Sequence, residues 1–295
     1  MSERIWNVLA LLLALALAAC GNNAPPPAEP PQTQAAAQVA VPAQEPEAGE
    51  VELIVFAAAS LTEPLDAIIA DYKAVAPNVT ILPNYDSSGT LKTQIENGAD
   101  VDIFISAGQK QMNQLDITAS AEVNAGGLDF VMEGTRLDLL ENKVALAVPE
   151  GNPKNIRSFD ELIAGLKEGS VLLAMGNSDV PVGQYTQKIL SSYGLDEGAL
   201  ANSGLITYGS NVKEVTAQVS EATVDAGIIY ASDAYSAGLS VAELASSEMT
   251  GGRVIYPAAV MKVTKNEDAA CAFLDYLTGD EASAAFSAAL FTPLS

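Results

Sequence analysis

Apolar residues follow two alternating patterns along the chain from residue 51 onward. Short continuous apolar runs, each bounded by small or turn-forming residues, are typical of buried strands. Such runs predict strands over residues 51–56, 79–82, 101–107, 144–148, 171–175, 226–230 and 254–263. Between several of these runs, apolar residues recur every three or four positions, which predicts helices. The helices cover residues near 61–72, 91–95, 158–166, 185–193 and 273–277. Strands that alternate with helices predict an α/β fold.

The part of the chain with these patterns is longer than most single domains, which have about 50–200 residues. We therefore expect two lobes, each of roughly a hundred residues or more. The apolar fraction of the whole sequence is 49%, which is enough to form a sizeable core.

The first fifty residues have the pattern of an export signal and a tether. A single Arg4 precedes an apolar run from Val8 to Ala19, which is too short to span a bilayer and suits a secretory signal. The run ends in Leu-Ala-Ala-Cys-Gly, which resembles a bacterial lipobox, so we expect a signal peptide over residues 1–19 and lipidation of Cys20. A non-lipidated signal peptide or an N-terminal anchor is the alternative.

Residues 20–50 are rich in Pro, Ala and Gln and contain few bulky apolar residues. Such a segment cannot bury enough surface to fold, which predicts a flexible tether. A tether behind a lipidated cysteine places the folded part on the extracytoplasmic face of the cell membrane.

Charge and composition exclude several classes of function. The sequence has 14 Lys and Arg residues against 37 Asp and Glu residues, a formal net charge of -23, so nucleic acid is a poor partner. The sequence has no His, which argues against a Ser-His-Asp hydrolase and against an enzyme in general. The two cysteines, Cys20 and Cys271, fit neither a disulfide framework nor a zinc site, and Cys271 is predicted to be a buried thiol. We expect no cofactor and no bare metal ion.

Three loops share one arrangement, in which small or hydroxyl residues lie directly after a strand and directly before a helix. They are residues 56–62, 85–91 and 176–185, and none of them contains Lys or Arg. In an α/β sheet, ligands bind beyond the carboxyl ends of the strands, where helix N-termini present unpaired N–H groups. The three loops together could therefore hold an oxyanion with neutral donors alone. Each loop taken singly is more often an ordinary helix cap.

These loops resemble those of the periplasmic molybdate-binding proteins, the receptors of molybdate ABC importers. The resemblance extends from about Val51 to the C-terminus. The matching stretches are residues 55–62 (VFAAASLT), 87–91 (SSGTL), 98–107 (GADVDIFISA) with Gln109-Lys110, 180–185 (VPVGQY), 227–233 (GIIYASD) and Tyr256-Pro257.

The resemblance implies a type II periplasmic-binding-protein fold, in which each lobe is a mostly parallel sheet flanked by helices and the ligand lies in the interlobe cleft. Lobe 1 would comprise residues 51–143 and 253–295, and lobe 2 would comprise residues 144–252. The expected ligand is molybdate or tungstate, whose order of preference the sequence does not reveal. The expected partner is the permease of an ABC importer, and the expected oligomeric state is a monomer.

The resemblance also implies a set of neutral ligand-binding residues. Hydroxyl and backbone N–H groups would come from lobe 1, backbone N–H groups from two positions of lobe 2, and a phenol O–H from a third. These residues are Ser60, Ser88, Val182, Val212 and Tyr230. Molybdenum would be bound only as the oxyanion and not as a bare metal ion.

Two acidic residues depart from this pattern. Asp86 precedes the serine pair, and Asp179 lies in the third loop. Their carboxylates either point to solvent or accept a proton from the ligand, and the second case would suit phosphate. A receptor for sulfate or phosphate therefore stays open as an alternative. Two further alternatives are a secreted serine hydrolase and an iron-binding receptor that uses Tyr208, Tyr230 and Tyr235.

Overall fold

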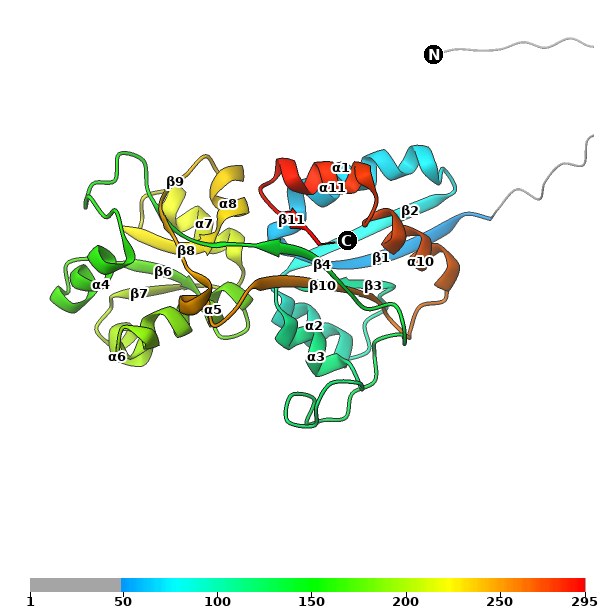
Figure 1. The fold of residues 1–295 in the computed structure, drawn as a ribbon, viewed down its shortest axis with the longest axis horizontal. Helices are drawn as coiled ribbons and strands as arrows, with labels where there is room; N and C mark the ends of the chain where they lie inside the picture. Colours follow the sequence, from blue (N-terminus) through cyan, green and yellow to red (C-terminus); the bar gives the residue numbers. More distant parts are fainter. Residues whose placement is uncertain (1–48, 295) are drawn as a thin grey trace, which may run out of the picture. The chain divides into compact units, whose positions relative to one another are not determined.

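Within residues 49–294, the part of the chain that the computed structural model describes, the strands form two sheets (Figure 1). The first sheet has the spatial order β11 (Thr292–Pro293), β4 (Leu137–Asn142), β10 (Val254–Val260), β3 (Ile103–Ile105), β1 (Val51–Ala58) and β2 (Val79–Asp86). The second has the order β7 (Ile206–Gly209), β6 (Leu173–Gly176), β8 (Ala226–Tyr230), β5 (Val144–Val148) and β9 (Ser240–Leu244). We call the first sheet with its helices lobe 1 and the second sheet with its helices lobe 2. The predicted signal peptide, Cys20 and nearly all of the predicted tether lie outside the described residues.

Both sheets are mixed, which corrects the prediction of mostly parallel sheets. In lobe 1, β1 pairs in parallel with β2 and β3, whereas β10 runs antiparallel to β3 and β4. In lobe 2, β6 pairs in parallel with β7 and β8, whereas β5 runs antiparallel to β8 and β9. The chain passes between the lobes through the antiparallel strands β4, β5, β9 and β10. An apolar run indicates that a strand is buried but does not indicate its direction, so the sequence pattern could not reveal these pairings.

Helices cover both faces of the lobe 1 sheet, because successive side chains of a strand point to opposite faces. Val55 and Ala57 belong to a core that also contains side chains of α1 (Thr62–Val75), α10 (Glu267–Tyr276) and α11 (Asp280–Ala288). Phe56 lies between them in the chain and joins a second core with α2 (Ser88–Glu96) and α3 (Gln109–Leu115). Since β1, β2 and β3 are parallel, their carboxyl ends lie at one edge of the sheet, and α1, α2 and α3 follow from that edge.

Lobe 2 repeats this arrangement with its own three parallel strands. β6, β7 and β8 lead into α5 (Pro181–Ser192), α7 (Val212–Ser220) and α8 (Ala231–Ser236), respectively, with α6 (Glu197–Asn202) between α5 and β7. Figure 1 shows α5 and α6 on one side of the lobe 2 strands and α7 and α8 on the other. The predicted capping box opens α4 (Phe159–Glu168), where the Ser158 hydroxyl accepts the Glu161 N–H at 3.2 Å.

Two crossings connect the lobes. The chain leaves lobe 1 at the end of β4 and enters β5 after Lys143, and it returns from β9 to β10 through the short helix α9 (Ser247–Thr250). Asn142, the last residue of β4, donates hydrogen bonds to residues of both lobes. Its Nδ2 donates to the Ser232 hydroxyl of lobe 2 at 2.8 Å and to the Tyr256 hydroxyl of lobe 1 at 3.2 Å.

Most predicted strands and helices are present, but their bounds differ. The run predicted as a strand over residues 101–107 is a strand only over Ile103–Ile105, because Asp102 turns its carboxylate back to accept the Ile54 N–H at 2.6 Å. Cys271 is only partly buried and packs at the edge of the core, which corrects the prediction of a buried thiol. Among the described helices, none combines the length and the apolar composition that crossing a membrane requires.

Candidate functional site

A small cavity lies between the strand ends of lobe 1 and the helix N-termini of lobe 2. Four of the five predicted ligand-binding residues line it, whereas Val182 does not, although Val180 and Pro181 do. The complete lining is Ala58, Ala59, Ser60, Asp86, Ser87, Ser88, Ala107, Val180, Pro181, Val212 and Tyr230. No Lys or Arg is in this lining, so the cavity offers neutral donors and one carboxylate.

The two adjacent serines at the start of α2 have different roles. Ser87 is the N-cap, and its hydroxyl accepts the Thr90 N–H at 3.1 Å. Ser88 is fully buried, and its hydroxyl accepts the N–H of Ala107 at 2.9 Å. Because this backbone donor occupies an acceptor position of the Ser88 oxygen, the Ser88 proton is left free to donate into the cavity. The helix cap and the candidate ligand donor are therefore neighbouring serines, and the sequence alone could not show which serine has which role.

A chain of hydrogen bonds connects Ser60 with both lobes. Its hydroxyl lies 2.9 Å from the Tyr256 hydroxyl, and both residues are buried. Asn142 Nδ2 is a donor only, so the Tyr256 oxygen accepts from Asn142. Either hydroxyl of the Ser60–Tyr256 pair can be the donor, and when Tyr256 donates, the Ser60 proton is available to the cavity. In the sequence, Tyr256 belongs to a matching stretch without a predicted role and Asn142 is not singled out, because they lie on β10 and β4, far along the chain from Ser60.

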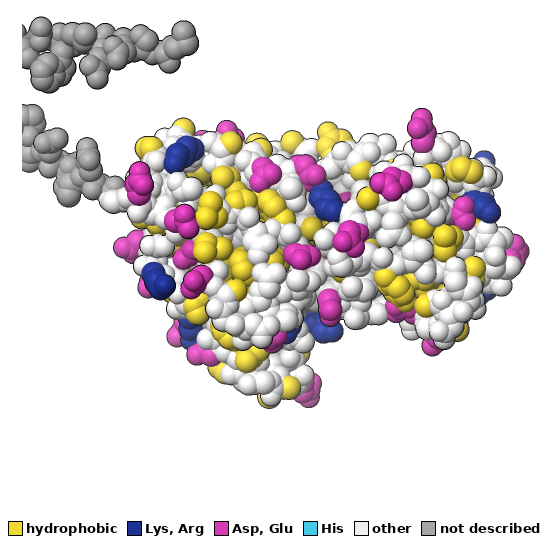
Figure 2. Space-filling model, turned by 180° about the vertical axis from the view of Figure 1, so that it is seen from behind, with side chains coloured by type: hydrophobic (Ala, Val, Ile, Leu, Met, Phe, Trp, Pro, Cys, Tyr) yellow, Lys and Arg dark blue, Asp and Glu magenta, His cyan; other side chains and the backbone are white. Residues whose placement is uncertain are grey.

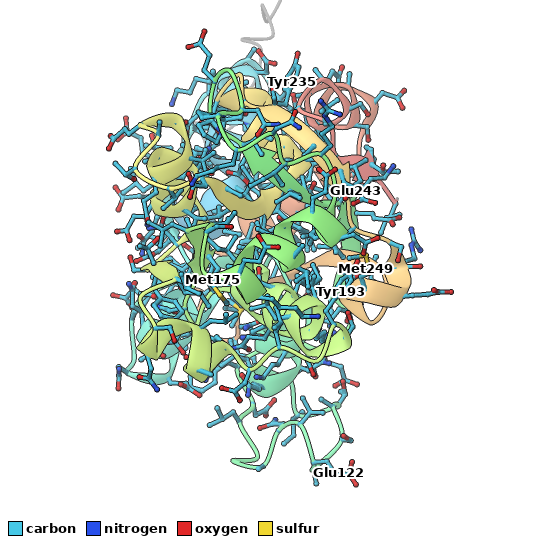
Figure 3. All side chains as sticks on the ribbon, turned by 90° about the vertical axis from the view of Figure 1, so that its left-hand side faces the viewer. Glu122, Met175, Tyr193, Tyr235, Glu243 and Met249 are labelled. Carbon is cyan, nitrogen blue, oxygen red and sulfur yellow. The ribbon has the colours of Figure 1, made fainter. Side chains whose placement is uncertain are left out.

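Tyr230 brings a phenol from the end of β8. The side chain is 1% exposed, and its hydroxyl donates to the Ala107 carbonyl at 3.4 Å. Burial is the main cause that raises the pKa of Tyr230 well above 10, so the phenol keeps its proton and acts as a donor. The other two tyrosines of the iron-site alternative do not join it. Tyr208 is 43% exposed and donates to Glu197, and Tyr235 is 58% exposed and lies at the surface (Figure 3).

Lobe 2 directs the N-termini of two helices toward the cavity. Pro181 is the first residue of α5, where a proline fits because no intrahelical N–H is needed. Asn211 caps α7 through its Oδ1, which accepts the Glu214 N–H at 3.1 Å, and this cap fixes the first residue, Val212, at the cavity. Unpaired N–H groups and the positive end of the helix dipole make such N-termini favourable for an anion.

The lobes touch at a backbone contact beside the cavity. The N–H of Gly89, in the first turn of α2, donates to the carbonyl oxygen of Asp179 at 3.1 Å. A Cβ at position 89 would lie 2.2 Å from that oxygen, so only glycine permits this approach. Gly89 thus permits the interlobe contact, and Gly183 lets α5 pack against Gly176 and Asn177 of its own loop.

The two acidic residues that depart from the family pattern, Asp86 and Asp179, lie in different surroundings. Asp179 is exposed and is not part of the cavity lining. Asp86 is half-buried and lines the cavity, and its Oδ1 accepts the Ser87 N–H at 2.7 Å and the Asn211 Nδ2–H at 3.4 Å. Both of these donors draw the Asp86 carboxylate toward α2 and α7. Elsewhere, acidic side chains outnumber basic ones and are spread over the surface, as Figure 2 shows for one face.

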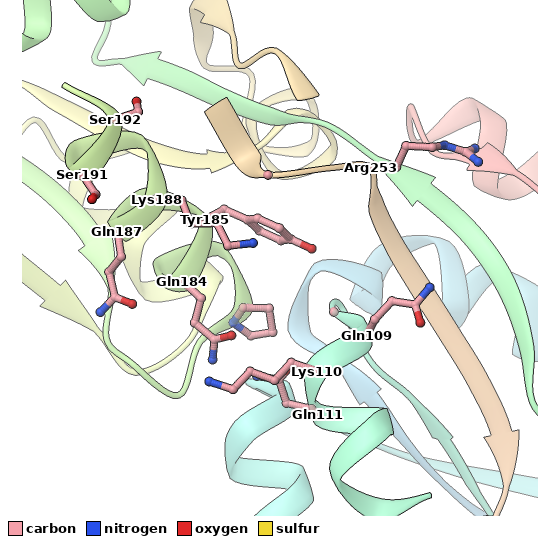
Figure 4. A pocket seen from close by; sticks show the side chains of 13 residues that line it. Gln109, Lys110, Gln111, Gln184, Tyr185, Gln187, Lys188, Ser191, Ser192 and Arg253 are labelled. Atoms are coloured by element: carbon pink, nitrogen blue, oxygen red, sulfur yellow. The ribbon is translucent and has the colours of Figure 1, made fainter. Parts of the chain in front are cut away.

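A wider hollow beside the cavity contains Lys110 and two basic residues that already have partners (Figure 4). It shares Pro181 with the cavity and includes Lys188 and Arg253. Lys188 donates to the Thr250 carbonyl at 3.0 Å and lies over the Tyr185 ring, and Arg253 pairs with Glu141. Within residues 49–294, no three His, Cys, Asp or Glu side chains are grouped in a way that could hold a metal ion.

Similarity to known proteins identifies the family of the chain. Residues 53–292 match the family of bacterial extracellular solute-binding proteins. This chain belongs to that family. The family consists of receptors for transported solutes and not of enzymes, and the two lobes described above form the type II fold of such receptors.

Two relatives and one solved structure cover most of the chain. A Bacillus subtilis protein described as a candidate ABC transporter substrate-binding lipoprotein is 31% identical and covers 82% of this chain and 87% of its own length. The molybdate-binding protein of Escherichia coli is 32% identical and covers 83% of this chain and 90% of its own. The substrate-binding domain of a candidate molybdenum ABC transporter from Clostridium difficile is 32% identical, with a TM-score of 0.59, and covers 83% of this chain and 100% of its own.

Replacing Gly89 tests whether the backbone contact sets the distance between the lobes. We expect Gly89→Ala to weaken binding of the ligand at least about tenfold. The added Cβ destabilises the closed form, in which the lobes are in contact, and a cost of about 1.4 kcal/mol to that form alone weakens binding tenfold. The thermal midpoint of the ligand-free protein should stay within about 2 °C of wild type. Gly126→Ala is the matched control, since its added Cβ meets Leu128 only at ordinary contact distances. Equal binding by both variants would contradict this account of the contact.

The buried carboxylate of Asp233 predicts a pH dependence of stability. Burial is the main cause that raises the pKa of Asp233 from 3.8 to about 7, partly offset by Lys213. The folded protein then binds more protons than the unfolded chain between these values, so this group's contribution to stability falls as pH rises from about 4 to about 7. Relative to Asp233→Asn, the wild type should lose unfolding free energy on the order of 4 kcal/mol over that interval. Denaturant unfolding at several pH values measures this difference, and parallel pH profiles of the two proteins would refute it.

Proposed function

We propose that the protein captures molybdate, and also tungstate, outside the cytoplasmic membrane and delivers it to an ABC importer. The observation that carries this proposal is the cavity between the lobes, where the hydroxyl groups of Ser60, Ser88 and Tyr230 and the N-terminus of α7 meet without any Lys or Arg. The Tyr230 O–H, which donates to the Ala107 carbonyl at 3.4 Å, would turn to the ligand. Tetrahedral oxyanions offer acceptor oxygens in every direction, so a cage that consists of donors suits them. The E. coli relative, whose name states molybdate binding, supports the choice of anion.

Val182 stays part of the proposed set. It follows Pro181, which lines the cavity, and it belongs to the first turn of α5, where backbone N–H groups have no intrahelical partner. A bound anion that is larger than the present cavity would bring oxygens closer to this N–H. The proposed ligand-binding residues are thus Ser60, Ser88, Val182, Val212 and Tyr230.

We further propose that lipidated Cys20 anchors the protein and that residues 20–50 act as the tether. The lipobox-like sequence supports the anchor, as does the description of the B. subtilis relative as a lipoprotein. The proposed lobe 1 comprises residues 51–143 and 253–295, and the proposed lobe 2 comprises residues 144–252. The proposed oligomeric state is a monomer. The permease would recognise the closed form, whose population the ligand increases.

Hydrogen phosphate is the second candidate ligand, and Asp86 is the observation that favours it. A carboxylate at the cavity repels a dianion but can accept the proton that phosphate retains at neutral pH. Asp86→Asn separates the two cases. The substitution should leave molybdate affinity unchanged or improve it, whereas a phosphate receptor should lose affinity for phosphate.

Calorimetric titration of the secreted form without lipid, at pH 7, tests the proposal with four anions. Molybdate and tungstate should bind with affinities within about tenfold of each other, because the two anions have the same shape and charge and nearly the same size. Sulfate, which is smaller, and phosphate should bind at least about a hundredfold more weakly, which corresponds to about 2.7 kcal/mol. Tight binding of sulfate or phosphate without molybdate binding would overturn the proposed function.

The neighbouring serines provide a matched pair of variants. Ser88→Ala should weaken molybdate binding roughly ten- to a hundredfold, as expected for loss of a hydrogen bond to a charged group. Ser87→Ala removes a helix cap instead, so it should lower the unfolding free energy by about 1 kcal/mol and change affinity only a few-fold. Tyr256 does not line the cavity, but Tyr256→Phe should still weaken binding, because Ser60 loses the hydroxyl group that orients it. The reverse pattern for the two serine variants would contradict the assignment of their roles.

A further inference from the structure

Lys213 lies between carboxylates that belong to different lobes. Its Nζ is 2.7 Å from both carboxylate oxygens of Glu63, which is in the first turn of α1 in lobe 1. The same Nζ is 3.4 Å from Oδ1 of Asp233, in the first turn of α8 in lobe 2. Lys213 itself follows Val212 at the start of α7, so the ion pair with Glu63 joins the lobes immediately beside the cavity.

Asp233 holds Lys213 on the lobe 2 side. Its carboxylate is fully buried, and within the described residues neither of its oxygens accepts a hydrogen bond of acceptable geometry. The ammonium of Lys213 favours the ionised form of this carboxyl group, and the ionised form in turn attracts Lys213. Because both residues belong to lobe 2, this contact does not depend on the distance between the lobes.

Glu63 belongs to lobe 1, so its contact with Lys213 depends on the distance between the lobes. The Glu63 side chain is 52% exposed and that of Lys213 is 32% exposed, so both could be solvated if the lobes moved apart. A second polar contact, from Asn211 Nδ2 to Asp86 Oδ1, crosses between the lobes on the other side of Val212 in the chain. Contacts that exist only when the lobes are together stabilise the closed form selectively.

We propose that Lys213 and Glu63 are positioning residues for ligand retention, with Lys213 held ready by Asp233. When the lobes close, Glu63 pairs with Lys213, keeps the first residue of α7 at the cavity, and slows the escape of the bound anion. Neither side chain lines the cavity, so neither contributes a ligand contact. This inference rests on the proposed function insofar as the cavity is the ligand site.

The effect should appear in the dissociation rate. Partly exposed ion pairs are weak, so Glu63→Gln should speed release of molybdate by about two- to fivefold, while the association rate changes less than about twofold. The unfolding midpoint of the ligand-free protein should not change, because the pair would be absent from the open form. Lys213→Arg keeps the charge and should retain slow release. High salt should bring the wild-type dissociation rate toward that of Glu63→Gln, since salt screens exposed charges.

The control is an ion pair that lies within lobe 1. Lys262 Nζ and Asp129 Oδ1 are 2.5 Å apart and similarly exposed, so Asp129→Asn removes a comparable charge without affecting the lobe contact. Stopped-flow measurement of tyrosine fluorescence with molybdate follows release from each variant. Wild-type release rates in Glu63→Gln, or equal acceleration in Asp129→Asn, would overturn the inference.

The same experiment distinguishes failure of this inference from failure of the proposed function. If the wild type binds sulfate or phosphate instead of molybdate, the proposed function fails, and the dissociation rates of that anion from the same variants still test the ion pair. If molybdate binds and only the variant rates disagree, the ion-pair inference alone fails. If none of the anions binds, both are overturned.

Discussion

The backbones of the two lobes meet beside the cavity, at the contact between Gly89 and Asp179. Because position 89 has no side chain, the first turn of α2 meets the loop before α5 directly, through one N–H donated to one carbonyl oxygen. This approach brings the strand ends of lobe 1 against the helix N-termini of lobe 2. The cavity, its lining and the ion pair of Lys213 with Glu63 all depend on that distance.

In the proposed site, neutral groups hold the anion, and two of them have hydrogen-bond partners before the ligand arrives. The Ala107 N–H donates to the Ser88 hydroxyl, and the Tyr256 hydroxyl lies 2.9 Å from that of Ser60. Preorganised donors of this kind lose little freedom on binding, which favours affinity. They also explain how a chain with a net charge of -23 can present an anion site, since the local dipoles act at contact distance while salt screens the more distant charges.

The sequence predicted the parts of the molecule that depend on local pattern. The apolar runs predicted β1, β2, β6 and β8, and the small residues after β1, β2 and β6 located loops that line the cavity. The sequence could not assign Ser87 to the cap and Ser88 to the cavity, since the deciding partner, Ala107, lies in the loop between β3 and α3. It did not predict the roles of Tyr256, Asn142 and Lys213, because these roles arise only when distant segments meet. The strands β4 and β9 were not predicted, and the direction of β10 was absent from the pattern of apolar residues.

A crystal structure of the protein with molybdate, with anomalous scattering recorded at the molybdenum edge, would locate the bound anion. We expect one strong peak in the cavity between the lobes. Its oxygens should lie within hydrogen-bonding distance of the Ser60, Ser88 and Tyr230 hydroxyls and of the Val212 N–H, with no Lys or Arg in contact. A peak in the basic hollow beside Lys188, or no peak at saturating molybdate, would contradict the account.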